Sequence, residues 1–288
     1  MDQKKYPTFG EMLRKADEEI ANLPQLITSA FPTREMRGGR SYLTIGMTNS
    51  GKTYWAWGTA MSIARDPAKY KVAIVSTEDN MFDIAEMVKI DRNDEVLERL
   101  VFDYIDNFNE AVMERLFAKY NELGVNVVVF DYLRPDIWQG YGQGLDSTTA
   151  YGKFYTSLYS QLAKYPMAFI HTIQANANLY DKPIQHVLKN EPERIVKSIE
   201  GGVNPPKRAR VVFLIVMNSS GTRGVFVQKA KLKDKRFQGF IIPYGEVEEN
   251  TLDVRYYQPL EIDEFFDGLI TKQDADNNGN SPHKRRGK

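Results

Sequence analysis

Short apolar runs alternate with helical stretches from about residue 41 onwards. The runs are SYLTIG, KVAIVS, LVFDYI, NVVVFDY and MAFIHTI, and helical patterns cover 53–65, 82–97, 109–122 and 146–164 between them. Runs of Val, Ile and Phe without polar alternation are typical of strands buried on both faces. The pattern therefore predicts an α/β fold whose mainly parallel central sheet is flanked by helices and joined by right-handed crossovers.

The pattern changes in the last third of the chain. ARVVFLIVM, RGVFVQKA, FQGFIIPY and LDVRYYQ follow one another with short connections, which is typical of antiparallel strands and predicts that they extend the sheet. Residues 178–208 before them are polar and carry GGVNPP. This stretch predicts a long loop with one helical piece near residues 190–199.

Both ends of the chain differ from this core. An apolar stripe of helical period runs from Phe9 to about Leu23, and Pro24 should end that helix. We therefore expect a helical appendage over 1–33, a core over 34–258, and an acidic and then disordered tail over 259–288. The acidic stretch EIDEFFDGLI is open to two interpretations, a partner-docking segment or an amphipathic terminal helix.

Composition excludes several classes of protein. Lys plus Arg equal Asp plus Glu at 38 each, so net charge supplies no general attraction to nucleic acid. The chain has no cysteine and three histidines, which excludes disulfides and thiolate zinc sites and leaves Mg²⁺ held by oxygens open. His171 lies in a predicted buried strand, where a core role is expected. Neither a signal peptide nor an apolar run of membrane-spanning length is present, which predicts a cytoplasmic protein without a membrane partner.

GMTNSGKT, Gly46 to Thr53, fits the P-loop pattern GxxxxGK[ST] and lies between a predicted strand and a predicted helix. Glycines permit tight turns in which backbone N–H groups surround phosphates, while Lys52 would offset β/γ charge and Thr53 would ligate Mg²⁺. ATP and Mg²⁺ are therefore the expected cofactors. The expected nucleotide-binding residues are Gly46, Asn49, Ser50, Gly51, Lys52, Thr53 and Tyr54.

Three polar residues follow predicted strands and complete the expected site. Asp131 ends NVVVFD, Glu78 follows KVAIVST, and Gln174 follows MAFIHTI. Because the carboxyl ends of parallel strands meet at one edge, these residues should converge with Lys52. We expect Asp131 to hold Mg²⁺, Glu78 to activate water, and Gln174 to sense the γ-phosphate. The alternatives are a turn or helix cap for Asp131 and a solvated loop acid or helix cap for Glu78.

Taken in order, GMTNSGKT, the Glu of VSTED, FDYLRPD and TIQAN resemble the RecA/DnaB class of ring- and filament-forming ATPases. FDYL looks like the Walker B end of DnaB-type helicases, and IQAN like their Gln-x-Asn switch. The resemblance covers about residues 34–258 and weakens after Gln174. It implies a RecA-like core, active sites shared between subunits, and a homo-oligomer that forms a hexameric ring or a filament.

The segment RGVFVQKAKLKDKRFQGFIIPYGE is similar in shape to the RecA strand pair whose two lysines reach the neighbouring subunit's nucleotide. By this resemblance Lys229 and Lys231 would be catalytic cations acting in trans. A solvated strand face is the alternative. The rival cations for the same role are Lys233, Lys235 and Arg236.

Two polar segments would line the centre of such a ring. RPDIWQGYGQGLDSTTAYGK follows Asp131, and DKPIQHVLKNEPERIVKSIEGGVNPPKRAR follows Gln174. In the resembled family the equivalent loops grip single-stranded nucleic acid, and DNA rather than RNA is the expected strand here. Trp138 and Tyr141 are candidate stacking platforms, although a loop aromatic can equally pack locally. Ordinary surface loops are the alternative.

The first hypothesis is an ATP-hydrolysing translocase, a phage- or plasmid-type hexameric replicative DNA helicase working with a loader or replication partner in the host cytoplasm. It would lack the family's separate amino-terminal domain, and the short first helix could instead pack on the adjacent subunit. The alternatives are a RecA-like strand-exchange or annealing recombinase that forms filaments, a viral genome-packaging ATPase, and a regulatory ATPase that binds no nucleic acid.

Overall fold

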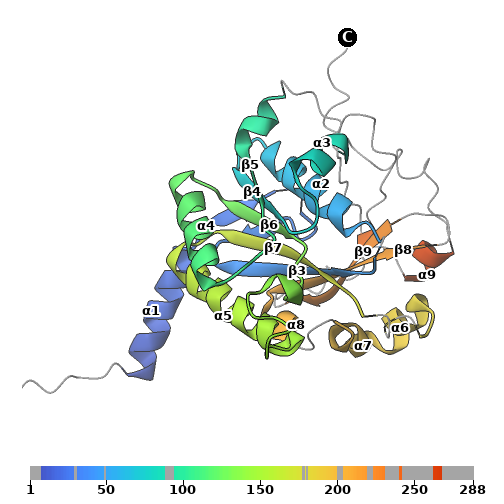
Figure 1. Ribbon diagram of the computed structural model, residues 1–288. Coiled ribbons are helices and arrows are strands. Elements are labelled where there is room, and N and C mark those ends of the chain that lie inside the picture. The colour runs from blue at the N-terminus through green and yellow to red at the C-terminus, as the bar shows by residue number, and fades with distance from the viewer. Residues whose placement is uncertain are drawn as a thin grey trace, which may run out of the picture.

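The computed structural model describes residues 8–28, 31–48, 50–87, 94–176, 179, 181–199, 204–218, 223–230, 240–241 and 262–267. These residues form a mixed α/β fold in which helices cover both faces of a mostly parallel central sheet (Figure 1). No helix within these ranges is both long and apolar enough to cross a membrane.

The central sheet has, in the described ranges, the strand order β10-β9-β8-β3-β7-β6-β4-β5. Its strands are β3 (Arg40–Gly46), β4 (Val72–Ser76), β5 (Leu100–Tyr104), β6 (Val127–Asp131), β7 (Ala168–Gln174), β8 (Val211–Met217), β9 (Arg223–Ala230) and β10 (Phe240–Ile241). β3 lies between β7 and β8 and is parallel to both. The predicted parallel core is therefore confirmed, and β3 is one of its inner strands.

The expectation that ARVVFLIVM begins an antiparallel extension is wrong. This run is β8, which pairs in parallel with β3, with Val211 opposite Tyr42. The connection from β7 to β8 is long enough to cross the sheet and return in the same direction, which a short turn cannot do. The antiparallel extension begins at β9 and continues with β10. LDVRYYQ lies outside the described residues.

Helices divide between the two faces of the sheet. The described helices are α2 (Lys52–Ala64), α3 (Met81–Met87), η1 (Glu95–Arg99), α4 (Glu110–Glu122), η2 (Pro135–Ile137), α5 (Ser147–Lys164), α6 (Ile184–Asn190), α7 (Pro192–Lys197), α8 (Asn204–Arg208) and α9 (Ile262–Phe266). α2, α3 and η1 contribute to the core on one face, and α4 to α7 with α9 to the core on the other. Residues 178–208 thus contain more helix than the single piece expected.

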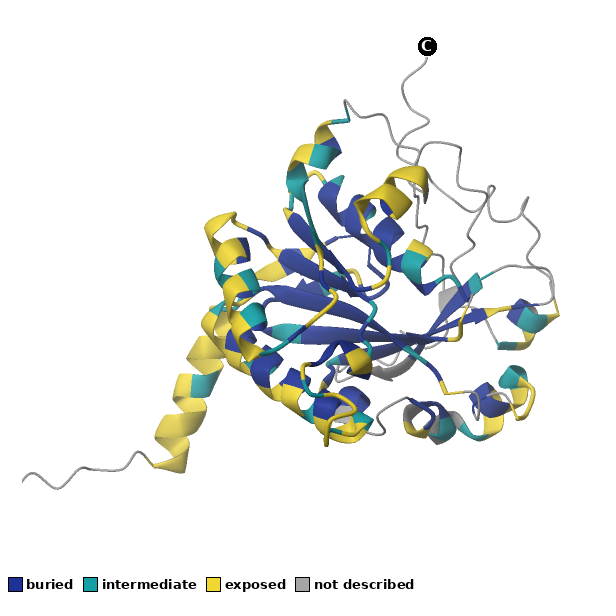
Figure 2. Ribbon diagram, in the orientation of Figure 1, coloured by how far each residue is buried: buried dark blue, intermediate teal, exposed yellow. Residues whose placement is uncertain are grey.

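Side chains of each buried strand alternate between these two cores. In β4, Val72 and Ile74 belong to the core beneath α2, whereas Ala73 and Val75 belong to the core beneath α4 and α5. All four are buried, and the inner strands β3, β4, β6, β7 and β8 form a buried layer in Figure 2, whereas the edge strand β5 is only partly buried. Burial on both faces explains the uninterrupted apolar runs of the sequence. His171 is fully buried in β7 and hydrogen-bonds Tyr155 at 2.5 Å, which confirms its core role.

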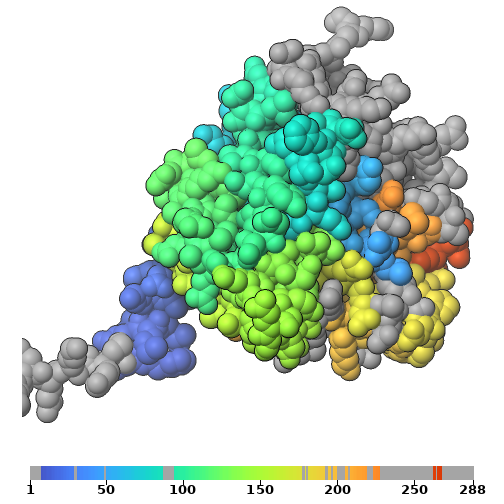
Figure 3. Space-filling view, in the orientation of Figure 1, coloured from blue at the N-terminus to red at the C-terminus, as the bar shows by residue number. Residues whose placement is uncertain are grey.

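The amino-terminal helix α1 (Phe9–Ala21) projects from the body of the molecule (Figure 3). Thr8 and Glu11 form a capping box at its start, which satisfies free N–H groups of the first turn. None of its residues is buried. The chain then forms β1 (Gln25–Ile27), which pairs antiparallel with β2 (Glu35–Arg37) in a small separate sheet.

The short helix α9 packs against the main body. Phe265 is 1% exposed and meets Phe226 of β9 edge to face, with ring centroids 5.3 Å apart. Its burial in the core favours the amphipathic terminal helix over a partner-docking segment.

Candidate active site

The P-loop leaves the carboxyl end of β3 and enters α2. Gly51, the N-cap of α2, has φ 88°, a conformation in which glycine avoids the strain that other residues suffer. A Cβ at Gly46 would collide with Ser50 Oγ and lie 2.9 Å from Lys52 Cγ. Both glycines are therefore needed for the loop to close so tightly. Asn49 lies outside the described residues.

The Lys52 side chain lies against the backbone of this loop. Its side chain is buried, and Nζ donates a hydrogen bond of 2.6 Å to the carbonyl oxygen of Met47. Burial lowers the pKa of the Lys52 ammonium, although the negative charges of Asp131 and Glu78 oppose the shift. The Lys52 ammonium therefore lies where the loop backbone and two carboxylates surround it.

Asp131 lies at the end of β6 with only 3% of its surface exposed. Oδ1 accepts a hydrogen bond of 2.7 Å from the Thr172 hydroxyl, and the side chain of Thr53 also hydrogen-bonds the carboxylate. Burial raises the pKa of Asp131 to about 6, while these two hydrogen bonds and the charge of Lys52 act in the opposite direction. The carboxylate thus joins the first turn of α2 to the sheet.

Glu78 and Gln174 approach from the same side. Thr77 Oγ1 donates to the carbonyl oxygen of Tyr132 at 2.7 Å, which holds the turn carrying Glu78 beside the end of β6. Gln174 Nε2 donates to Thr48 Oγ1 of the P-loop, also at 2.7 Å. Unlike Asp131, Glu78 is exposed.

These residues surround one cavity of about 390 Å³. Its lining comprises Thr48, Gly51, Lys52, Thr53, Tyr54, Glu78, Tyr132, Gln174 and Arg223. The expected convergence of Lys52, Glu78 and Gln174 is therefore found, with Asp131 bonded to Thr53 at its edge. Such a cavity combines backbone turns, two cations and carboxylates, which are the groups that bind a charged, metal-bound ligand.

Three residues that line the cavity were not predicted from the sequence as site residues. Thr48 occupies a variable position of the P-loop pattern, and Tyr132 follows Asp131, so the motifs themselves pointed to both. Arg223 begins β9 and donates from Nε to the carbonyl oxygen of Ser50 at 3.1 Å. No local sequence signal marks Arg223, because only the strand order places β9 near the P-loop.

The expected trans-acting lysines are only partly described. Lys229 lies on β9, where its backbone is opposite Val212 of β8 next to a register shift. The side chain of Lys229 is not among the described parts of the structure. Lys231, Lys233, Lys235 and Arg236 lie outside the described residues.

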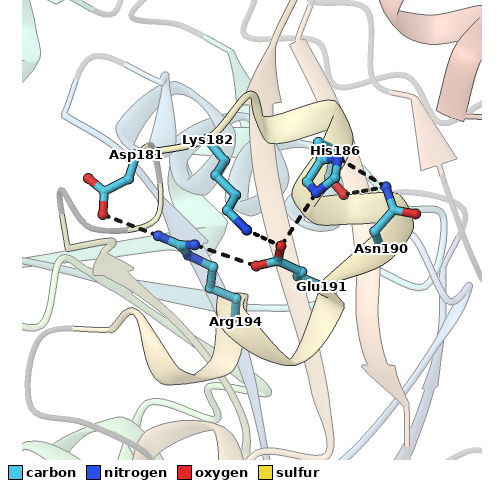
Figure 4. A network of polar contacts seen from close by, with 6 residues as sticks. All are labelled: Asp181, Lys182, His186, Asn190, Glu191 and Arg194. Atoms are coloured by element: carbon cyan, nitrogen blue, oxygen red, sulfur yellow. Dashed lines mark hydrogen bonds and ion pairs between the residues drawn. The ribbon is translucent and has the colours of Figure 1, made fainter.

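The segment after Gln174 folds into α6 and α7, and a network of charged and polar side chains joins these helices to the residues before and between them (Figure 4). Glu191 pairs with Lys182, Arg194 and His186, and Arg194 also meets Asp181 at 3.2 Å. Lys189 is paired with Asp263 of α9. Acids of the described chain thus neutralise much of the positive charge that was expected to face nucleic acid.

The two candidate stacking aromatics differ. Trp138 is 5% exposed and packs among Phe108 and Phe154 of the core, so its ring faces are unavailable for stacking. Tyr141 is 37% exposed. Of the pair, only Tyr141 presents its ring to solvent.

The donors present fit a magnesium nucleotide. No group of three or more His, Asp or Glu side chains that could hold a metal exists among the described residues. Mg²⁺ in a P-loop site does not need one, since it takes a hydroxyl, one or two carboxylates, phosphate oxygens and water. Thr53 and Asp131, already hydrogen-bonded to each other, provide that hydroxyl and that carboxylate.

No protein-family model matches the chain, and no curated protein shows detectable similarity to it.

Proposed function

We propose that the protein is an ATPase with a RecA-like core that moves along single-stranded nucleic acid, most simply a hexameric DNA helicase of phage or plasmid type. One observation carries the proposal. Lys52 and Thr53 of a P-loop lie beside Asp131, two strands away, and the intervening strand β7 ends in Gln174, which is bonded to that loop. A P-loop lysine, a buried carboxylate and a strand-end amide around one cavity support this proposal.

Each group has a role suited to its surroundings. Lys52, held on the Met47 carbonyl, supplies a positive charge for the β- and γ-phosphates. Thr53 and Asp131 would hold Mg²⁺, which would neutralise charge that develops on the phosphates. Glu78 is exposed at the cavity, where it can orient water and accept its proton.

Gln174 is suited to report the state of the nucleotide. Its amide bonds Thr48, and the next residue, Ala175, donates from its backbone to the carbonyl oxygen of Gly46 at 2.9 Å. Ala175 also forms a bridge with Ile199, at the far end of the α6–α7 segment. A shift of the P-loop can therefore pass through Gln174 to that segment, which in this proposal borders the nucleic acid.

Helix α1 supports assembly into an oligomer. It exposes Phe9, Met12 and Leu13 to 74%, 56% and 48%. Burying such side chains against a second subunit would be favourable, because apolar surface removed from water stabilises association. In this proposal α1 packs on the adjacent subunit.

The proposed trans role of Lys229 and Lys231 has a direct test. Subunits carrying Lys229→Ala or Lys231→Ala would be mixed with Glu78→Gln subunits, so that some interfaces combine an intact Glu78 with intact lysines. Recovery of turnover in the mixture is expected. Complete absence of complementation would argue against action in trans.

A recombinase is the second candidate, because β9 and β10 pair antiparallel, with Phe240 opposite Val225, as in the strand pair that suggested RecA. The deciding experiment measures the particle mass with and without an ATP analogue and a single-stranded oligonucleotide, while the ATPase rate is followed. A closed ring with strand-stimulated turnover is expected. Filaments whose length follows the strand would favour the recombinase, and a monomer indifferent to nucleic acid would defeat both.

A further inference from the structure

Arg223 lies on the P-loop although it follows Ser50 by 173 positions. Its Nε donates to the Ser50 carbonyl oxygen at 3.1 Å. A Cβ at Gly51 would fall 2.5 Å from the same Nε and 2.8 Å from Arg223 Cδ. Gly51 thus has a second purpose besides its positive φ, because any larger residue would push the arginine off the loop.

The strand order gives this arginine a distinct position. Glu78, Asp131 and Gln174 come from β4, β6 and β7, which all lie on one side of the P-loop strand β3. Arg223 comes from β9 on the other side, and among the described residues that line the cavity no other comes from that flank. The hydrolytic groups and Arg223 therefore face the P-loop from opposite directions.

We propose that Arg223 binds the α- and β-phosphates of the nucleotide, from the same subunit as the P-loop. The inference rests on the proposed ATPase function: if the γ-phosphate lies at Glu78 and Gln174, the remainder of the nucleotide extends toward the β9 flank. A guanidinium suits this position, since its planar fork can donate two parallel hydrogen bonds to a phosphate. It also keeps its charge at every physiological pH.

This placement predicts a role in affinity rather than in rate. Hydrolysis breaks the bond to the γ-phosphorus and leaves intact the α- and β-phosphates, which ATP and ADP share. A contact to them stabilises substrate, transition state and product alike, so that its loss raises KM and Kd and lowers kcat little. A contact to the γ-phosphate would instead weaken ATP alone.

The experiment compares Arg223→Ala, Arg223→Gln and Arg223→Lys with the wild type by calorimetric titration of ADP and of a non-hydrolysable ATP analogue. We expect Arg223→Ala and Arg223→Gln to weaken both ligands by the same factor, about tenfold to a hundredfold, as for loss of a charge-assisted hydrogen bond. Arg223→Lys should be intermediate. Arg115→Ala, an exposed arginine on α4, is the matched control and should bind as the wild type does.

Two results would overturn the inference. Arg223→Gln keeps an N–H donor for the Ser50 carbonyl but has no charge. Wild-type affinity of this variant for both nucleotides would show that Arg223 only stabilises the loop. A loss confined to the ATP analogue, accompanied by a fall in kcat, would place Arg223 at the γ-phosphate. Failure of the wild type to bind either nucleotide would instead refute the ATPase proposal itself.

Discussion

The Thr172 hydroxyl of β7 donates a hydrogen bond of 2.7 Å to Oδ1 of Asp131 on β6. Both side chains are buried, and Thr53 bonds the same carboxylate from the first turn of α2. The carboxylate is therefore fixed from two sides by groups of the protein. If Asp131 holds Mg²⁺ as proposed, a carboxylate fixed in this way needs little reordering to bind the ion, which favours binding.

The buried carboxylate should make stability depend on pH. The pKa of Asp131 rises from 3.8 to about 6 on folding. Between about pH 4 and 6 the folded chain therefore keeps a proton that the unfolded chain has lost, and the free energy of unfolding falls as pH rises through this window. Asp131→Asn has no carboxyl group at this position and does not lose this stability. The free energy of unfolding of Asp131→Asn minus that of wild type should therefore increase by about 2–3 kcal/mol from pH 4 to 7.

Urea denaturation of the two proteins across this pH range measures the difference. Asp17→Asn, at an exposed position on α1, is the matched control and should follow the wild type. A difference in the free energy of unfolding between Asp131→Asn and wild type that stays constant from pH 4 to 7 would contradict the prediction.

Lys52→Ala should lower ATP turnover at least about a hundredfold, since it removes the cation that the P-loop holds and that, in the proposed function, contacts the phosphates. The rate of phosphate release at saturating ATP is the measurement. Lys153→Ala, an exposed lysine of α5, should retain the wild-type rate. Unchanged turnover in Lys52→Ala would refute the assignment of the site.

Glu78→Gln should lower kcat about a hundredfold or more while ADP affinity is kept, because the amide cannot accept a proton from water. Asp79→Asn tests the neighbouring acid. Asp79 is not among the residues lining the cavity, and its backbone N–H is bonded to Ser76 Oγ at 3.0 Å. Its kcat should stay within about threefold of wild type. A larger loss of kcat in Asp79→Asn than in Glu78→Gln would identify Asp79 as the general base.

Gln174→Ala should uncouple turnover from nucleic acid, because it removes the bond from β7 to Thr48. The quantity to measure is the ratio of the ATPase rate with a single-stranded oligonucleotide to the rate without it, which we expect to fall toward one. Thr48→Ala removes the same bond from its other end and should have the same effect. If both variants keep the full ratio, the Gln174–Thr48 contact does not transmit the signal.

Phe9→Ser with Leu13→Ser should reduce assembly without unfolding the subunit. No α1 side chain is buried within the chain, so the substitutions remove no internal packing. Mass measured by light scattering should fall, and the melting temperature of the dissociated subunit should change by less than about 2 °C. Arg14→Ser on the same helix is the control. An unchanged mass in the double variant would exclude α1 from the interface.

Local sequence patterns predicted much of the site. Gly46 to Thr53 form a loop between strand and helix as expected, and the apolar run before Asp131 is a buried strand of the sheet. Such features depend on residues adjacent in sequence, where glycines and uninterrupted Val and Ile runs have direct physical meaning. The roles of these residues and the RecA/DnaB resemblance stay predictions.

What the sequence could not provide is the order of the strands. Thr172 reaches Asp131 because β7 lies next to β6, and Arg223 reaches the P-loop because β9 lies next to β8, the neighbour of β3; no local pattern encodes this order. The same gap explains the wrong direction expected for β8. Trp138 shows a further limit, because a polar neighbourhood in sequence did not reveal that its ring is buried against Phe154.

The bridge between Ala175 and Ile199, with Asn176 N–H donating to the Ser198 carbonyl at 2.7 Å, closes the α6–α7 segment at its base. The chain leaves the sheet and returns at one place, so residues inserted within the segment need not alter the pairing of β3 with β7. Such sites tolerate changes of length. A fluorescent label on Lys197, an exposed residue of α7 two positions before the bridge, would therefore make a practical reporter of movement at the base of the segment.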